Sequence, residues 1–227
     1  MAEPARAPRP DTSDMFAVHG VFRDTLGAAP QLVGDIAPGD AERVALVENY
    51  YENILSFLEA HHDGEEAVVF PALRERCASS GQLLDRLEAE HKDALRLLGA
   101  ARGALAVWPG AGDAASQAAT ADSLEALRVQ LCAHLDEEEA DALPLCADNL
   151  SMEEWGALPG HAMANFGGDK IWLILGLIRE RMNEQQRAAM LEHMPPPAVE
   201  MWTGFGEQAF KELSNEVVVE VRNRVPD

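Results

Sequence analysis

The stretch HHDGEEAVVFPAL, at positions 61–73, decides how this chain is interpreted. A second stretch, HLDEEEADALPL at positions 134–145, repeats its arrangement of histidine, acidic residues and proline. Each contains a histidine followed four residues later by a glutamate, and four residues is about one helical turn. Both side chains of a pair should therefore project from one helix face towards the same point. The pairs are His62 with Glu66 and His134 with Glu138.

The apolar residues around these stretches follow helical spacing, and no segment alternates for long enough to predict a strand. We expect long helices over about 13–26, 40–77, 83–107 and 122–143. Asp40 is a suitable N-cap for the second of them, and Pro71 should kink or shorten its end. The stretch WPGAGDAASQAATA, at 108–121, is expected to be a loop because it is rich in Gly, Ala and Ser.

Each of the four expected helices carries a histidine on its apolar stripe. A lone histidine on such a stripe is usually a hydrogen-bonded core residue, and a single His–Glu pair in an acidic helix is often a solvated ion pair. Four such stripes, two of them adding a glutamate, instead predict a metal site inside a helical bundle. Imidazole suits iron, copper and zinc, and carboxylates can bridge two metals. The expected metal is a pair of iron ions. The four histidines are His19, His62, His91 and His134.

The overall composition restricts the classes of partner. The chain has 227 residues and a net charge of -21, which should repel nucleic acid and anionic lipid headgroups. Its three cysteines show no C-x-x-C spacing, which favours a reducing compartment over a disulfide framework. The longest apolar run, IWLILGLI from Ile171, is far shorter than the roughly 20 residues of a membrane span. We therefore expect a cytoplasmic protein with no nucleic-acid or membrane partner, and a homodimer is left open.

The set formed by His19 and the motifs HHDGEEAVVFP, EHKDAL and HLDEEEADALP resembles the haemerythrin-like family of HHE cation-binding domains. That resemblance implies an all-α fold, an up-and-down four-helix bundle, here with an additional C-terminal helical extension. It further implies two non-haem Fe ions, oxo- or hydroxo-bridged, that bind and react with O2, H2O2 or NO. Carried over by position, the implied metal ligands are His19, His62, Glu66, His91, His134 and Glu138.

The chain departs from the oxygen-carrying members of the family at one position. Those members have a further histidine one turn after the third-helix ligand, where this chain has Leu95. Loss of that donor favours redox chemistry over reversible oxygen carriage. Three further residues are additional candidates for the site. Asp63 is a substitute ligand or a solvent-facing acid, and Tyr51 is a cavity hydroxyl or a core residue. His61, with Glu65, forms a competing register for the second-helix pair.

The expected organisation is a disordered arm over 1–12, the di-iron bundle over 13–147, and a C-terminal extension packed on the bundle over 148–227. The extension has helices at about 169–182 and 184–193, and a last one from about 198. The predicted function is binding of and reaction with small oxidants or gases in a redox or oxidative-stress response. Two alternatives remain open: a di-iron enzyme that decomposes peroxide or acts as an oxidase, and a metal-stabilised module that senses iron or oxygen.

Overall fold

The computed structural model describes residues 9–222, and all its regular elements in that range are helices. Residues 1–8 of the expected N-terminal arm lie outside the described part. The first part of the chain forms α1 (Asp14–Gly27), α2 (Ala29–Gly34), α3 (Ala41–Gly64), η1 (Glu65–Val69), α4 (Phe70–Arg76), η2 (Ala78–Ser80), α5 (Gly81–Ala111), α6 (Ala114–Glu137), η3 (Glu138–Ala142) and α7 (Leu143–Asn149). The second part forms α8 (Met152–Asn165), α9 (Ile171–Glu180), α10 (Glu184–His193), α11 (Pro196–Met201), η4 (Trp202–Gly206) and α12 (Glu207–Arg222).

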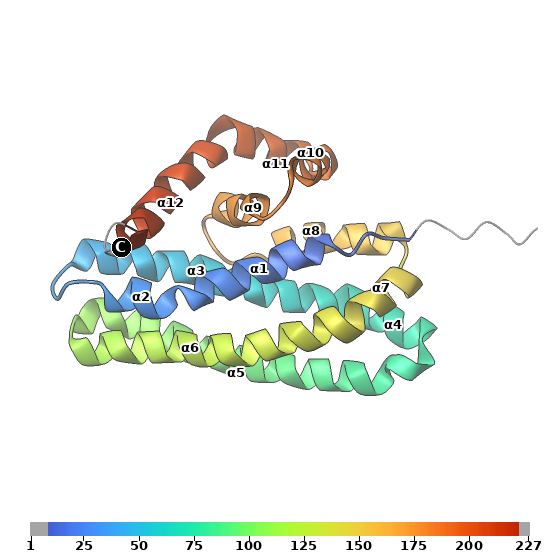
Figure 1. Ribbon diagram of the computed structural model, residues 1–227, viewed down its shortest axis with the longest axis horizontal. Coiled ribbons are helices and arrows are strands. Elements are labelled where there is room, and N and C mark those ends of the chain that lie inside the picture. Colours follow the sequence, from blue (N-terminus) through green and yellow to red (C-terminus); the bar gives the residue numbers. More distant parts are fainter. Residues whose placement is uncertain (1–8, 223–227) are drawn as a thin grey trace, which may run out of the picture.

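The helices α1, α3, α5 and α6 lie side by side along the long axis of the molecule (Figure 1). Each contacts two of the others, because α1 meets α6 and α3, while α5 meets α6 and α3. The chain direction reverses from each of these helices to the next (Figure 1). Residues on their inner faces therefore come from four different parts of the sequence and meet in one interior.

Side-chain caps begin two of these helices. Asp40 accepts a hydrogen bond from the backbone N–H of Arg43 at the start of α3 (3.0 Å), which confirms its expected role. Asp113 does the same for Ser116 at the start of α6 (2.8 Å). Gly112, between α5 and α6, has a φ of +60°, a left-handed conformation that glycine adopts without steric cost.

The expectation of a loop over 108–121 is wrong. Helix α5 continues to Ala111 and α6 already begins at Ala114, so only Gly112 and Asp113 separate them. The stretch is rich in alanine, the best helix former, and its glycine and aspartate act as cap residues for the two helices. Pro109 lies in the last turn of α5. The fourth helix therefore starts earlier than position 122, where the sequence predicts its beginning.

A π-helical segment interrupts the regular helix at the same place in both repeated stretches. The segment η1 starts at Glu65 and η3 starts at Glu138, and each is followed by a short α-helix with proline in its first turn. Pro71 and Pro144 have no backbone N–H group. A wider π turn tolerates the hydrogen bond that is missing as a result, so the helix continues beyond each proline. Such segments are frequent at functional sites.

The buried apolar residues form two clusters, and a layer of histidines lies between them. The larger cluster includes Phe22, whose ring centroid lies 5.4 Å from that of His61. The smaller one includes Phe70, whose ring stacks on His91 with centroids also 5.4 Å apart. The polar interior is thus closed by apolar side chains at both ends.

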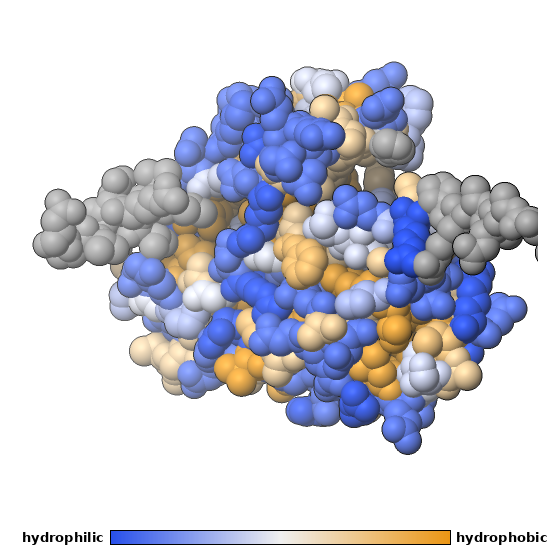
Figure 2. Space-filling model, turned by 45° about the vertical axis from the view of Figure 1, so that its right-hand side comes forward, coloured by the Kyte–Doolittle hydropathy of each residue, from blue (hydrophilic) through white to orange (hydrophobic). Residues whose placement is uncertain are grey.

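The C-terminal helices pack against the flank of the bundle formed by α1 and α3 (Figure 1). A capping box of Ser151 and Glu154 opens α8, and the last helix follows Pro195, close to where the sequence predicts it. Buried residues of α9 and α12 join the larger hydrophobic cluster. Among the described residues, no helix is long and apolar enough to cross a membrane. Hydrophilic side chains cover most of the face seen in Figure 2.

Candidate metal centre

Seven buried side chains from four long helical segments meet in the middle of the bundle. They form two groups in which the possible ligand atoms all lie within 4.8 Å of one another. The first group is His62, Glu65, His91 and His134, and the second is His19, His61, Glu65 and Glu138. Because Glu65 belongs to both, one carboxylate connects the two groups.

The distances inside each group are those of side chains that share a centre without bonding directly. Glu65 lies 3.4 Å from His61 Nε2 and 3.5 Å from His91 Nε2. Glu138 Oε2 likewise lies 3.5 Å from His19 Nε2 and 3.7 Å from His134 Nε2. Each carboxylate therefore faces one histidine of either group, as a bridging carboxylate would.

Most of the inward-facing polar atoms lack a hydrogen-bond partner. They are Nε2 of His19, His61 and His62, both carboxylate oxygens of Glu65, and Oε2 of Glu138. Buried polar atoms are normally paired, because leaving one unpaired costs about 1–3 kcal/mol. A concentration of such atoms at one point is the pattern that a bound cation would satisfy.

The outward-facing nitrogens of three histidines, by contrast, are paired with carboxylates. Nδ1 of His19 donates to Glu139 Oε1 (2.8 Å), Nδ1 of His91 to Glu66 Oε1 (3.0 Å), and Nδ1 of His134 to Glu90 Oε2 (2.8 Å). A proton on Nδ1 leaves the lone pair on Nε2, which faces the interior. This is the usual arrangement of metal-binding histidines.

The contact between His91 and His134 gives the same indication. Their Nε2 atoms lie 3.2 Å apart. When both rings carry their protons on Nδ1, two lone pairs face each other, and a cation between them removes the repulsion.

The structure places Glu66, one of the expected ligands, outside the centre. Its side chain is 46% exposed and binds His91 from outside, whereas that of Glu65 is 1% exposed and faces the centre. Successive helix residues are about 100° apart, so Glu65 falls between the directions of His61 and His62 while Glu66 lies beyond them. Both His61 and His62 consequently face the interior. The two registers, His61 with Glu65 and His62 with Glu66, therefore differ in which glutamate faces the centre and not in which histidine does.

The sequence contains a signal that separates the two registers. Pro144 follows Glu138 by six residues, and Pro71 follows Glu65, not Glu66, by six. The two stretches therefore align with His61 opposite His134. His62 then has Leu135 as its counterpart, so it is an addition to the repeated motif.

The other candidates lie away from the centre. Asp63 is exposed. Tyr51 is fully buried, and its hydroxyl donates to the backbone carbonyl of Thr25 (3.0 Å), which agrees with the core-residue alternative. Leu95 is 53% exposed, so a side chain there does not point inward. His62, on the neighbouring helix, belongs to the first of the two groups, and its ring stacks on His91 at a centroid distance of 4.0 Å.

Burial disfavours the charged forms of His61, His62, His91 and Glu65. Desolvation lowers the pKa of His61 and His62 well below the usual value, and lowers the pKa of His91 to about 3, with neighbouring histidines adding to each effect. Desolvation and then the nearby Glu138 raise the pKa of Glu65 well above its usual value. Neutral imidazoles are the form that binds metals, and a cation would offset the charge of Glu65.

Comparison with known proteins agrees with this geometry. Residues 11–146 match the profile of the hemerythrin HHE cation binding domain. The chain belongs to this family. The matched region contains all seven residues of the centre and ends within α7, before α8 begins. Comparisons with curated proteins and with solved structures gave no significant match.

Proposed function

We propose that the hemerythrin domain is an up-and-down four-helix bundle whose interior holds two iron ions, and that these react with O2, H2O2 or NO. The observation that carries this proposal is the pair of donor groups sharing Glu65, in which six buried polar atoms have no partner. Five imidazoles and two carboxylates suit iron, which accepts both nitrogen and oxygen donors.

In this proposal the residues divide into three roles. His62, His91 and His134 hold one metal, and His19 and His61 hold the other. Glu65 and Glu138 lie between the two groups and neutralise part of the positive charge. Glu66, Glu90 and Glu139 orient three of the histidines by accepting their Nδ1 protons. A pair of iron ions supplies reversible two-electron redox chemistry when bound.

The protein around the centre determines what reaches it. Apolar rings close the interior at both ends, which excludes bulk water and charged substrates. Seven donors for two metals leave positions free for a small molecule. The absence of a donor from Leu95 is made up by His62, so the number of histidines does not by itself favour turnover over reversible binding.

The first test is metal content per chain, followed by the optical spectrum of the reduced protein during exposure to air. We expect two irons per chain and a spectral change on oxidation. A band that disappears again under vacuum would indicate reversible oxygen binding. Consumption of added H2O2 over many turnovers would indicate an enzyme. A protein that binds no iron from an anaerobic ferrous solution would refute the proposal.

A metal-stabilised sensing module is a second candidate function. It is favoured by the C-terminal helices, which extend beyond the family match and pack on the flank of the bundle.

The free cysteines Cys77, Cys132 and Cys146 agree with a reducing compartment, and we propose a cytoplasmic location. Fractionation of cells that express the full chain would test that location.

A further inference from the structure

Helix α1 brings His19 to the centre and is fixed by the segment that follows the hemerythrin domain. It has only 14 residues, whereas α3 and α6 have 24 each and α5 has 31. A short helix has few packing contacts of its own, so its position depends more strongly on what lies against it.

The beginning of α1 is held by α8. The indole Nε1 of Trp155 donates to Asp14 Oδ1 (3.2 Å), and Trp155 is 7% exposed. The ring of Trp155 also belongs to the same hydrophobic cluster as Met15, the next residue of α1. A hydrogen bond and burial in a shared apolar cluster therefore fix this end.

The other end of α1 is held by Arg181, directly after α9. Its guanidinium forms an ion pair with Asp24. A Cβ atom at Gly20 would overlap the same guanidinium, so glycine at this position is what lets Arg181 lie against α1. Gly20 is adjacent to His19.

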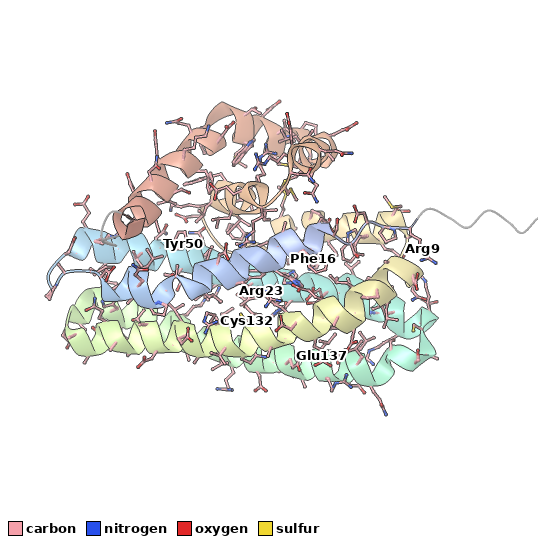
Figure 3. The ribbon with its side chains drawn as sticks, viewed as in Figure 1. Arg9, Phe16, Arg23, Tyr50, Cys132 and Glu137 are labelled. Atoms are coloured by element: carbon pink, nitrogen blue, oxygen red, sulfur yellow. The ribbon has the colours of Figure 1, made fainter. Side chains whose placement is uncertain are left out.

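The opposite flank of α1 is tied to α6 through the network around His19. Arg23 donates to Glu139 Oε1 (3.0 Å), the oxygen that also accepts from His19 Nδ1, and to the carbonyl of Cys132 (3.2 Å). Figure 3 shows Arg23 beside Cys132 between the two helices. His19 lies five residues after Asp14 and five before Asp24, so the two outer contacts bracket it along the helix.

We propose that Trp155 and Arg181 are positioning residues for His19, through which the C-terminal helices control metal exchange at one of the two donor groups. The group of His19, His61, Glu65 and Glu138 depends on α1. The group of His62, Glu65, His91 and His134 draws instead on α3, η1, α5 and α6. Weakening the two contacts should speed the release of the first metal and leave the release of the second unchanged. The metal part of this inference rests on the proposed function.

The test compares the full-length double variant Trp155→Phe with Arg181→Met against the unchanged protein. Phenylalanine keeps the ring and removes only the N–H donor. The matched control is Arg179→Met, two residues away, because Arg179 lies over the Trp202 ring within the C-terminal helices. Each protein is loaded with ferrous iron without oxygen, and release to a chelator is followed in time. A His19→Ala variant identifies which kinetic phase belongs to the group that contains His19.

We expect two phases, with the His19-dependent phase about 2- to 30-fold faster in the double variant, as for distant residues that bias a site. The other phase and the control should keep their rates. Equal acceleration of both phases would show a general loss of stability and overturn the inference, as would an unchanged His19-dependent phase. If the unchanged protein binds fewer than two irons, the proposed function fails. Amide hydrogen exchange over residues 14–27 then decides the positioning role. Faster exchange in the double variant supports that role and unchanged exchange refutes it.

Discussion

Replacing Glu65 and Glu66 separately with glutamine should give opposite results, although the two residues are adjacent. Glu65 belongs to both donor groups and is 1% exposed, so Glu65→Gln removes the shared carboxylate without changing its shape. We expect loss of at least one iron per chain. Glu66 binds His91 from outside, so Glu66→Gln should keep both irons and weaken binding about 10- to 100-fold at most.

Glu65→Gln should also stabilise the metal-free protein. The pKa of Glu65 is raised by burial above its ordinary value of 4.5. Each pH unit by which a folded-state pKa exceeds the unfolded one costs about 1.4 kcal/mol of folding free energy once the pH lies above both values. Because the folded pKa is the higher one, this cost disappears as the pH falls to 4.5. Glutamine has no such cost, so metal-free Glu65→Gln should be more stable than the unchanged metal-free protein at pH 7, and this gain should disappear below pH 4.5.

The assay is urea unfolding of the chelator-treated proteins at pH 7 and pH 5, with iron content measured on separate loaded samples. Glu66→Gln is the matched control, since its half-exposed side chain has little folding free energy to gain. The reasoning would be refuted if Glu66→Gln lost iron while Glu65→Gln retained it. It would also be refuted if Glu65→Gln made the metal-free protein less stable at pH 7.

Three further predictions concern regions away from the centre. Arg76 holds the pKa of Glu154 down to about 2. Glu154→Gln should therefore lower the free energy of unfolding in urea by roughly 0.5–1 kcal/mol at pH 7. This loss should shrink as the pH falls from 4.5 towards 2, because only the ionised carboxylate is stabilised. An undiminished difference at pH 3 would contradict this. A thiol alkylating reagent should modify Cys77 well before Cys146, because a hydrogen bond lowers the pKa of the first while burial raises that of the second; equal rates by mass spectrometry would argue against it. Gly176→Ala should lower the stability by about 1–3 kcal/mol in thermal unfolding, because the new methyl group would overlap an aromatic ring of α12. An unchanged melting temperature would show that α9 and α12 are not closely packed.

The sequence by itself determined the composition of the site more than its register. Helical spacing placed His19, His91, His134 and Glu138 on inner faces, and the structure brings all four into the centre. Apolar stripes are strong local signals because burying them is what drives helices to pack. The HHE resemblance also follows from local motifs, and the family match confirms it.

The choice between Glu65 and Glu66 was decided by the tertiary structure. The two residues are about 100° apart on one helix, so periodicity alone does not separate them when histidines stand at both 61 and 62. Packing of α3 against α1 and α5 turns both histidines inward and leaves only Glu65 between them. The π segments that follow Glu65 and Glu138 are likewise tertiary features, since their sequences also suit an ordinary helix.

The turn between α5 and α6 and the placement of the C-terminal helices show the same limit. Composition predicted a loop over 108–121, but alanine-rich sequence becomes helical when its neighbours bury one of its faces. The contacts of Trp155 and Arg181 with α1 join residues more than 140 positions apart in the chain. Local patterns in a sequence specify faces and caps, whereas which faces meet depends on packing among distant segments, and only the folded chain determines that.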